Sequence, residues 1–268
     1  MSNQTYYKDG YDSTISNSHA WRTAENSCGY MLSYLKPTDR ILDVGCGPGT
    51  ITYDLAKYIP HGEIIGIEPT RELIEEAINN KSLDHEVQRG NVKFQEASAF
   101  QLPFQDETFD IVHAHQVIIH LSEPLKALKE MRRVLKKGGH LCFRDSEIRS
   151  ALIYPEEYED PISYYFEKIK SEFTSTIAAS RAKHLTIKAG FIPENIINTT
   201  STWCISNKND RLWFSELYLK RLTKIKFQPD DKYDQVQLET AWKQWANDDY
   251  SWFVMLHGEI VAKKELES

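Results

Sequence analysis

The feature that most constrains this chain is the segment ILDVGCGPGT at residues 41–50. An apolar run typical of a buried strand leads into three closely spaced glycines, Gly45, Gly47 and Gly49, and a helical pattern begins at Thr50. Glycine lets the backbone turn sharply and lets a ligand approach it closely. A strand, a glycine-rich turn and a helix in this order predict a parallel α/β sheet with a ligand site at the turn.

The first half of the chain continues this alternation of short apolar runs and amphipathic stretches. Strands that alternate with helices predict right-handed crossovers and a parallel sheet, which binds ligands beyond its C-terminal strand ends. We expect one helix to start at Thr70 and another to be capped by Ser122 and stopped by Gly138 and Gly139. Further helices are expected at 24–35 and 50–59, and strands at 40–44, 63–67, 92–95, 109–114 and 140–144.

The second half combines two further strands with aromatic and helical segments. Five of the six tryptophans lie beyond residue 200, and they either pack a helical cap onto the sheet or line a substrate pocket. Strands are expected at 196–205 and 252–262, and helices at 181–189, 211–226 and 235–246. We expect a single domain over residues 1–268, with a core of about 20–146, 178–206 and 250–264 and cap insertions at about 147–176 and 209–248.

Composition excludes several classes of protein. The chain of 268 residues is 41% hydrophobic and carries a formal net charge of −7, so it is neither disordered nor a good binder of nucleic acid or of anionic membranes. Its apolar stretches are far shorter than the ~18 residues of a membrane span. A polar N-terminus without a signal sequence and four scattered cysteines predict a cytoplasmic protein with reduced thiols.

The residues around the glycine turn indicate which ligand it binds. Glu68 ends the next expected strand, 25 residues after Asp43, where an acid can accept hydrogen bonds from ribose hydroxyls. The dinucleotide pattern GxGxxG would need a glycine at Thr50, and Pro48 removes one N–H donor. A negative charge at Asp43 favours a ligand with an ammonium group over a diphosphate. Alternatively, Asp43 only organises the turn and Glu68 is a solvated surface acid.

These motifs resemble those of the class I S-adenosylmethionine-dependent methyltransferases, over roughly residues 20 to 145. One segment resembles the quinone-biosynthesis type of these enzymes, and the first and last segments resemble a branch found in fungi and bacteria. The segments are WRTAENS (21–27), ILDVGCGPGT (41–50), IIGIEPT (64–70), LPFQDETFDIV (102–112), VIIHLSEPLKALKEMRRVLKKGG (117–139, the quinone type) and WFVMLHGEIVA (252–262).

The resemblance implies a Rossmann-like three-layer α/β/α sandwich with a mostly parallel seven-stranded sheet, its last strand antiparallel, and helical cap insertions. It also implies S-adenosylmethionine as cofactor and S-adenosylhomocysteine as product. The glycines would face the methionine part, with Asp43 near its amino group, and Glu68 would hold the ribose. The other cofactor-binding residues implied are Arg22 at the carboxylate, Cys46 and Thr50 in the turn, Pro69, Ser98 and Ala99 near the adenine, and His115 and Gln116 towards the acceptor. Arg22 is alternatively a structural ion-pair partner.

Methyl transfer from a sulfonium needs alignment and exclusion of water more than catalytic groups. A hydroxyl, thiol or carbon acceptor would need a base, for which His115 or His120 are the candidates, whereas a carboxylate would need none. We expect no metal, because no carboxylate or cysteine completes a set with His113, His115 and His120. His113 is interpreted as a strand residue with a satisfied ring.

The resulting hypothesis is a methyltransferase for a small-molecule substrate, with O, C or N as the methylated atom. It has no nucleic-acid partner and no membrane span, and it is a monomer or a homodimer. The alternatives are a non-catalytic module that binds the cofactor or a partner, and a nicotinamide-dependent oxidoreductase.

Overall fold

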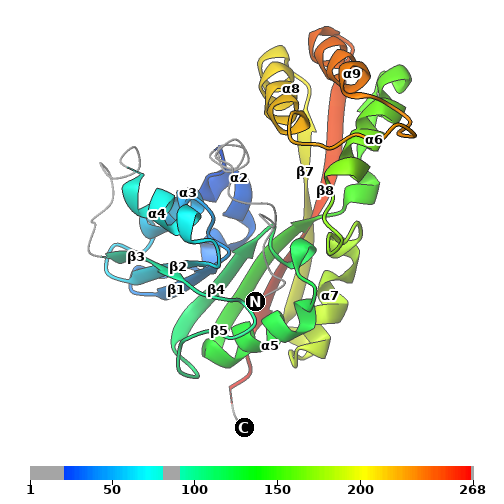
Figure 1. Cartoon of the computed structure of the whole chain (residues 1–268). Helices are drawn as coiled ribbons and strands as arrows, with labels where there is room; N and C mark the ends of the chain where they lie inside the picture. The colour runs from blue at the N-terminus through cyan, green and yellow to red at the C-terminus, as the bar shows by residue number, and fades with distance from the viewer. Residues whose placement is uncertain (1–20, 81–90, 267–268) are drawn as a thin grey trace.

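The computed structural model describes residues 21–80 and 91–266. Its centre is one sheet in the order β3-β2-β1-β4-β5-β8, with β7 along the other edge of β8 (Figure 1). The strands are β1 (Arg40–Val44), β2 (Glu63–Glu68), β3 (Val92–Glu96), β4 (Phe109–His115), β5 (Leu135–Ser146), β6 (Leu152–Tyr154), β7 (Ile196–Ile205) and β8 (Trp252–Lys263).

Strand directions confirm the expected fold class and correct the strand number. Strands β1 to β5 pair in parallel, whereas β8 runs antiparallel to both β5 and β7. Among the described residues the sheet has eight strands instead of the expected seven. The additional strand is β6, which pairs with the start of β8 on the same side as β5, where Leu152 lies opposite Val254. It lies within the region expected to form the first cap insertion.

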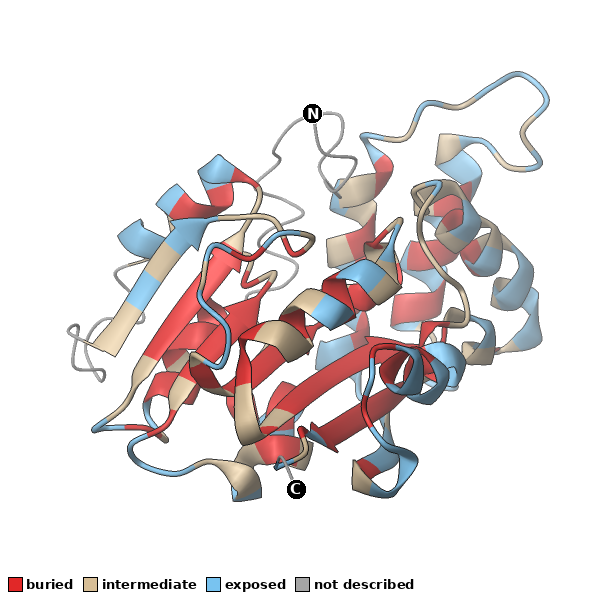
Figure 2. Cartoon of the chain, turned by 90° about the horizontal axis from the view of Figure 1, so that it is seen from below, coloured by how far each residue is buried: buried red, intermediate tan, exposed pale blue. Residues whose placement is uncertain are grey.

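Helices cover both faces of the sheet and form the other two layers. One apolar core joins β1, β2 and β4 to α2, η1 and α3, and a second joins the opposite face of the sheet to α5 and α7 (Figure 1). In Figure 2 the buried residues follow the strands, and the exposed ones lie on the outer sides of the helices. The elements are α2 (Ala24–Cys28), η1 (Gly29–Tyr34), α3 (Thr50–Ala56), α4 (Arg71–Asn79), η4 (Ile118–His120), α5 (Pro124–Val134), η5 (Ile148–Ser150) and α7 (Ala178–Lys188).

The boundaries of one predicted helix were wrong at both ends. The N-cap of α5 is Glu123, not Ser122, because Pro124 occupies the first helical position, where its missing N–H costs no hydrogen bond. The helix ends at Val134, four residues before Gly138, because Leu135 already pairs with Phe109 of β4. The pairing of β5 with β4 outweighs the helix-stop signal of the glycine pair. The helix expected at 24–35 is likewise divided into α2 and η1.

A third apolar core lies in the cap. It is built from α6 (Glu159–Ile169), α8 (Lys208–Leu222), α9 (Gln235–Asn247), β6 and the ends of β7 and β8. Trp242 and Trp245 are fully buried in it, as the packing interpretation of the tryptophans predicts. Figure 1 shows β7 and β8 running from the sheet up to these helices. Two 3-10 turns, η6 (Glu156–Tyr158) and η7 (Pro193–Asn195), complete the described elements. None of the helices in the described part of the chain is long and apolar enough to cross a membrane.

Candidate active site

The glycine turn after β1 is held against the end of β2. The N–H groups of Gly45 and Cys46 donate to the carbonyl of Ile67 at 2.8 and 3.0 Å. Gly45 and Gly47 have φ angles of +72° and +52°, which L side chains rarely adopt. A Cβ on Gly45 would lie 2.5 Å from a methyl carbon of Val117, whereas one on Gly47 would meet nothing within 4 Å. The turn therefore leaves open space above Gly47.

This turn forms one end of a cavity of about 240 Å³ that lies beyond the C-terminal ends of β1, β2 and β4. The cavity brings together most of the residues that the sequence singled out. Those that line it are Arg22, Asp43, Gly45, Cys46, Gly47, Thr50, Glu68, Pro69, Ala99, His115, Gln116 and His120.

Two predicted residues do not line the cavity. A Cβ on Gly49 would lie 2.7 Å from the ring of Phe94 and 3.0 Å from Ala77, so this glycine serves the packing of α4 and β3. Ser98 turns its Oγ back to accept the N–H of Phe100 at 3.1 Å. Ala97 and Ala99 line the cavity on either side of Ser98.

Asp43 lies in the cavity floor with both carboxylate oxygens already bonded. Its Oδ1 is 2.8 Å from Nδ1 of His113, and its Oδ2 accepts the hydroxyl of Thr52 at 2.6 Å. Asp43 and His113 meet because they are register partners on β1 and β4. Nε2 of His113 lies 3.3 Å from Sγ of Cys28. Burial opposes ionisation of His113, but Cys28 and Asp43 outweigh it and raise its pKa to about 10. The prediction of a satisfied ring at His113 is confirmed.

Glu68 ends β2 and lines the cavity beside the glycine turn. Its Oε1 accepts the backbone N–H of Thr70 at 3.3 Å. Burial raises the pKa of Glu68 to about 7, against the opposing effect of hydrogen bonds from Thr70 and Gly47. A carboxylate at this place can accept hydrogen bonds from a ligand with neighbouring hydroxyls, and such bonds would favour its ionised form.

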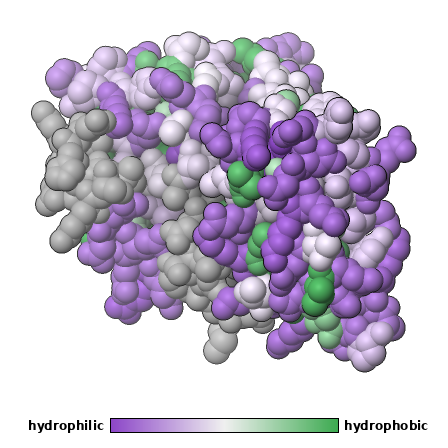
Figure 3. All heavy atoms as spheres, turned by 90° about the horizontal axis from the view of Figure 1, so that it is seen from above, coloured by the Kyte–Doolittle hydropathy of each residue, from purple (hydrophilic) through white to green (hydrophobic). Residues whose placement is uncertain are grey.

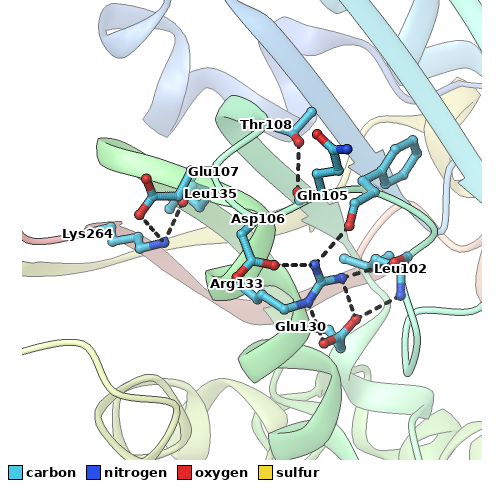
Figure 4. Close-up of polar contacts among 10 residues, drawn as sticks. Leu102, Gln105, Asp106, Glu107, Thr108, Glu130, Arg133, Leu135 and Lys264 are labelled. Atoms are coloured by element: carbon cyan, nitrogen blue, oxygen red, sulfur yellow. Dashed lines mark hydrogen bonds and ion pairs between the residues drawn. The ribbon is translucent and has the colours of Figure 1, made fainter.

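The loop that carries Ala97 and Ala99 continues to β4 and is anchored by Arg133 of α5 (Figure 4). The guanidinium donates to the carbonyls of Leu102 and Phe104 at 3.0 and 2.8 Å, and to Asp106 Oδ1 at 2.8 Å. Glu130, one turn earlier on α5, pairs with Arg133 and accepts the N–H of Leu102 at 2.9 Å. This network fixes the loop that forms one side of the cavity.

His115 is the last residue of β4 and Gln116 follows it, and both line the cavity. Neither ring nitrogen of His115 has a hydrogen-bond partner in the described part of the chain. Burial, followed by the charges of Arg22 and Arg144, holds the pKa of His115 well below its usual value. Gln116 has a φ of +57°, a strained conformation that is typical of functional sites. Its Oε1 accepts the hydroxyl of Ser146 at 2.8 Å.

His120 lies 3.3 Å, Nδ1 to Oγ1, from Thr174. Burial lowers its pKa to about 3, with further lowering by Arg221 and Arg22. The site thus disfavours the protonated form of both histidines that were candidates for a base. Either ring can stay neutral beside a ligand, but neither is suited to accept a proton from it.

The far wall of the cavity comes from the cap. Trp203 of β7, Tyr218 and Arg221 of α8, and Phe253 and Met255 of β8 line it together with Ile148, Ala151, Phe166, Ile169 and Lys170. Trp203 is one of the tryptophans that the sequence offered as pocket lining, whereas the sequence analysis did not name the other residues. The spacing of Tyr218 and Arg221 on one helical face is a local signal for them. The face of the molecule seen in Figure 3 is largely hydrophilic, with isolated hydrophobic side chains. The aromatic side chains named here are instead turned into the cavity.

Metal ligands are not gathered in this region. Within residues 21–80 and 91–266 no group of three or more histidine, cysteine or acidic side chains could hold a metal ion. Cys28, Cys46, Cys142 and Cys204 are free thiols.

Comparisons with known proteins agree with the geometry. A family model described as a methyltransferase domain matches residues 35–216. An uncharacterized methyltransferase from Schizosaccharomyces pombe is 42% identical, over 98% of both chains. A demethylmenaquinone methyltransferase from Lactococcus lactis is 32% identical over 48% of this chain and 49% of its own. A phosphoethanolamine N-methyltransferase from Haemonchus contortus, solved with S-adenosylhomocysteine, has the same fold: the TM-score is 0.60 at 16% identity, over 99% of this chain and 61% of that one.

Proposed function

Because the chain belongs to the class I S-adenosylmethionine-dependent methyltransferases, we propose that it methylates a small molecule enclosed between its sheet and its cap. The enzyme class and the cofactor follow from the family, which does not favour a non-catalytic module. The small-molecule acceptor and the residue roles are our proposal.

The glycine-turn end of the cavity fits the cofactor. Open space above Gly47 admits a ligand against the backbone, and the carboxylate of Glu68 faces the same space. We assign Gly45 and Gly47 to the amino-acid part, Glu68 to the ribose, and Pro69 with Ala99 to the base. We assign Asp43 to holding the strand end in place, since its two carboxylate oxygens bond to Thr52 and His113.

The observation that carries the small-molecule proposal is the cap wall. Phe166, Tyr218 and Phe253 line the same cavity as the glycine turn, and they come from the third apolar core. A concave, mostly apolar cavity is typical of small-molecule sites. The net charge of −7 also argues against a nucleic-acid substrate.

The protein's part in the reaction is to align the acceptor and exclude water. S-adenosylmethionine, when bound, supplies a methyl group that its sulfonium already activates. Holding two reactants in line can contribute about 7–11 kcal/mol to lowering the barrier. The apolar cap wall keeps water from the reacting atoms. Because burial keeps His115 and His120 neutral, we assign them to lining the acceptor end and not to removing a proton.

The test has two independent parts. Calorimetry with S-adenosylhomocysteine should show binding that is weakened in a Gly47→Val variant. Labelled S-adenosylmethionine, incubated with the enzyme and a metabolite extract, should transfer its methyl group to a compound that organic solvent extracts. Label found only in protein or nucleic acid would refute the small-molecule proposal.

The proposal also includes location and assembly. We propose a cytoplasmic enzyme, in keeping with its four free cysteines, that is a monomer or a homodimer. Cell fractionation and light scattering test these two statements.

A further inference from the structure

The cavity is electrically asymmetric. The two carboxylates among its described lining residues, Asp43 and Glu68, both belong to the glycine-turn end. The cap end instead carries Lys170 and Arg221. Lys170 pairs with Glu167, which is largely exposed, and Arg221 lies over the ring of Tyr218 with its Cζ 5.9 Å from the ring centroid. Among the described lining residues, the cap end thus carries positively charged side chains and no carboxylate.

The cavity wall also contains buried hydrogen-bond donors. The Nε1 of Trp203 and the Nε2 of Gln116 are buried and have no partner in the described part of the chain. A buried donor without a partner costs about 1–3 kcal/mol, so such atoms in a cavity wall indicate a ligand with acceptor atoms. Both residues line the cavity beside the cap's apolar side chains. The wall thus offers donors to one part of a ligand and aromatic surface to the rest.

Neither His115 nor His120, the two histidines among the described lining residues, is suited to take a proton from a neutral acceptor. Burial together with the charges of Arg22 and Arg221 disfavours a proton on His120, and burial with Arg22 and Arg144 disfavours one on His115. Burial, the largest cause of these shifts, disfavours any charge here, whereas the neighbouring arginines favour a negative charge on a ligand. An acceptor that enters already ionised needs no base and can pair with Arg221, which lines the cavity.

We propose that the acceptor is an apolar ring compound carrying an anionic oxygen, a carboxylate or an ionised phenol, which Arg221, Trp203 and Gln116 hold at the cap end for O-methylation. This inference rests on the proposed function. A lone pair of the oxygen forms the bond to the methyl carbon while the methyl–sulfur bond breaks and its electron pair goes to sulfur. One anion and one sulfonium give an ester or ether and a neutral thioether, so no proton is removed at the site.

Binding of matched probes tests the charge requirement without using turnover. The probes are 2-naphthoate and its neutral amide for the carboxylate arm, and 4-nitrophenolate and 4-nitroanisole for the phenolate arm. Each is titrated calorimetrically into the full chain saturated with S-adenosylhomocysteine. We expect at least one anion to bind at least about tenfold more tightly than its neutral partner, as expected for hydrogen bonds to a charged group. The arm that shows the preference identifies the acceptor class.

Variants then assign the preference to Arg221. Arg221→Met should abolish the tenfold preference and leave the neutral probe's affinity within about twofold, whereas Arg221→Lys should restore part of it. Lys220→Met is the matched control, since Lys220 is the neighbouring charge, pairs with Glu216 on the surface and does not line the cavity. Melting curves verify that each variant is folded.

The outcomes separate this inference from the proposed function. If S-adenosylhomocysteine does not bind, the proposed function fails. If it binds, but in both arms the neutral probe binds as well as the anion, the anionic-acceptor inference is overturned while the methyltransferase stands. A preference that Arg221→Met leaves intact, in a folded protein, also overturns it.

Discussion

Cofactor affinity should depend on the ionisation of Glu68. In the empty cavity, burial raises the pKa of this carboxyl to about 7. Ribose hydroxyls donate hydrogen bonds to the carboxylate form, so binding lowers the pKa of Glu68 and favours loss of its proton. Acid therefore opposes binding, because below pH 7 the proton must be removed before the ribose can be held.

The size of the effect follows from the pKa. With a value near 7, about half of the free enzyme is ionised at pH 7 and about one eleventh at pH 6. Affinity should fall about fivefold from pH 7 to 6 and about tenfold more from pH 6 to 5, where each tenfold step is about 1.4 kcal/mol. Above pH 8 it should level off.

Calorimetry with S-adenosylhomocysteine from pH 5 to 8 measures how the affinity changes with pH. Repeating the titration at pH 7 in buffers of different ionisation enthalpy should show that binding releases about half a proton. Glu68→Gln should flatten the slope and weaken binding at pH 8 by about tenfold or more, since it removes a charged hydrogen-bond acceptor.

Other titrating groups near the cavity can be separated from Glu68. The pKa values of His120 and His257, about 3 and 2, and of His113, about 10, lie outside the range of the experiment. Burial raises the pKa of Asp145 to about 7, but this carboxyl does not line the cavity and instead accepts the N–H of Ile119 at 3.1 Å. Asp145→Asn is therefore the control and should keep the slope. A wild-type affinity equal at pH 5 and 8, or a slope that Glu68→Gln retains, would refute the reasoning.

Three further substitutions test the scaffold of the site. Gly45→Ala places a Cβ 2.5 Å from Val117 at a φ of +72°. It should lower the free energy of unfolding, measured by urea denaturation, by about 1–3 kcal/mol. Unchanged stability would contradict the steric argument. Asp43→Asn leaves the buried His113 without its carboxylate and should cost about 3–5 kcal/mol, visible as a lower Tm, with exposed Asp106→Asn as the comparison. Arg133→Ala removes the anchor of residues 102–106 and should cost about 2–3 kcal/mol and speed hydrogen exchange in that loop; exchange that stays as slow as in the wild type would show that another contact holds it.

The glycine-turn end of the cavity could be predicted because its signals are local. Residues 41–68 contain a strand, a turn that needs positive φ and an acid at the end of the next strand. The positive φ angles of Gly45 and Gly47 follow this pattern. Gly49 shows the limit of this reasoning. Its φ of +80° follows the same pattern, but glycine is also required there by the side chain of Phe94, which only the folded sheet brings near.

The acceptor end could not be predicted, since its wall joins elements that are distant in the sequence. Trp203, Arg221 and Phe253 meet only when β7, α8 and β8 pack together. The histidines illustrate a second limit, because the pKa of His120 depends on burial and on two arginines about a hundred residues away on either side. Local propensity likewise misplaced the ends of α5, where pairing of Leu135 with Phe109 decides the boundary.

Strand β8 belongs both to the central sheet and to the cap, so the choice of acceptor and the stability of the whole fold depend on the same strand. Ile260 and Ala262 belong to the core beneath the sheet, whereas Phe253, on the same strand, belongs to the cap and lines the cavity. Grafting a cap from a relative onto this chain would therefore cut through a strand bonded along both edges. New acceptors are more readily reached by changing single side chains on α6 and α8 than by exchanging the cap as a module.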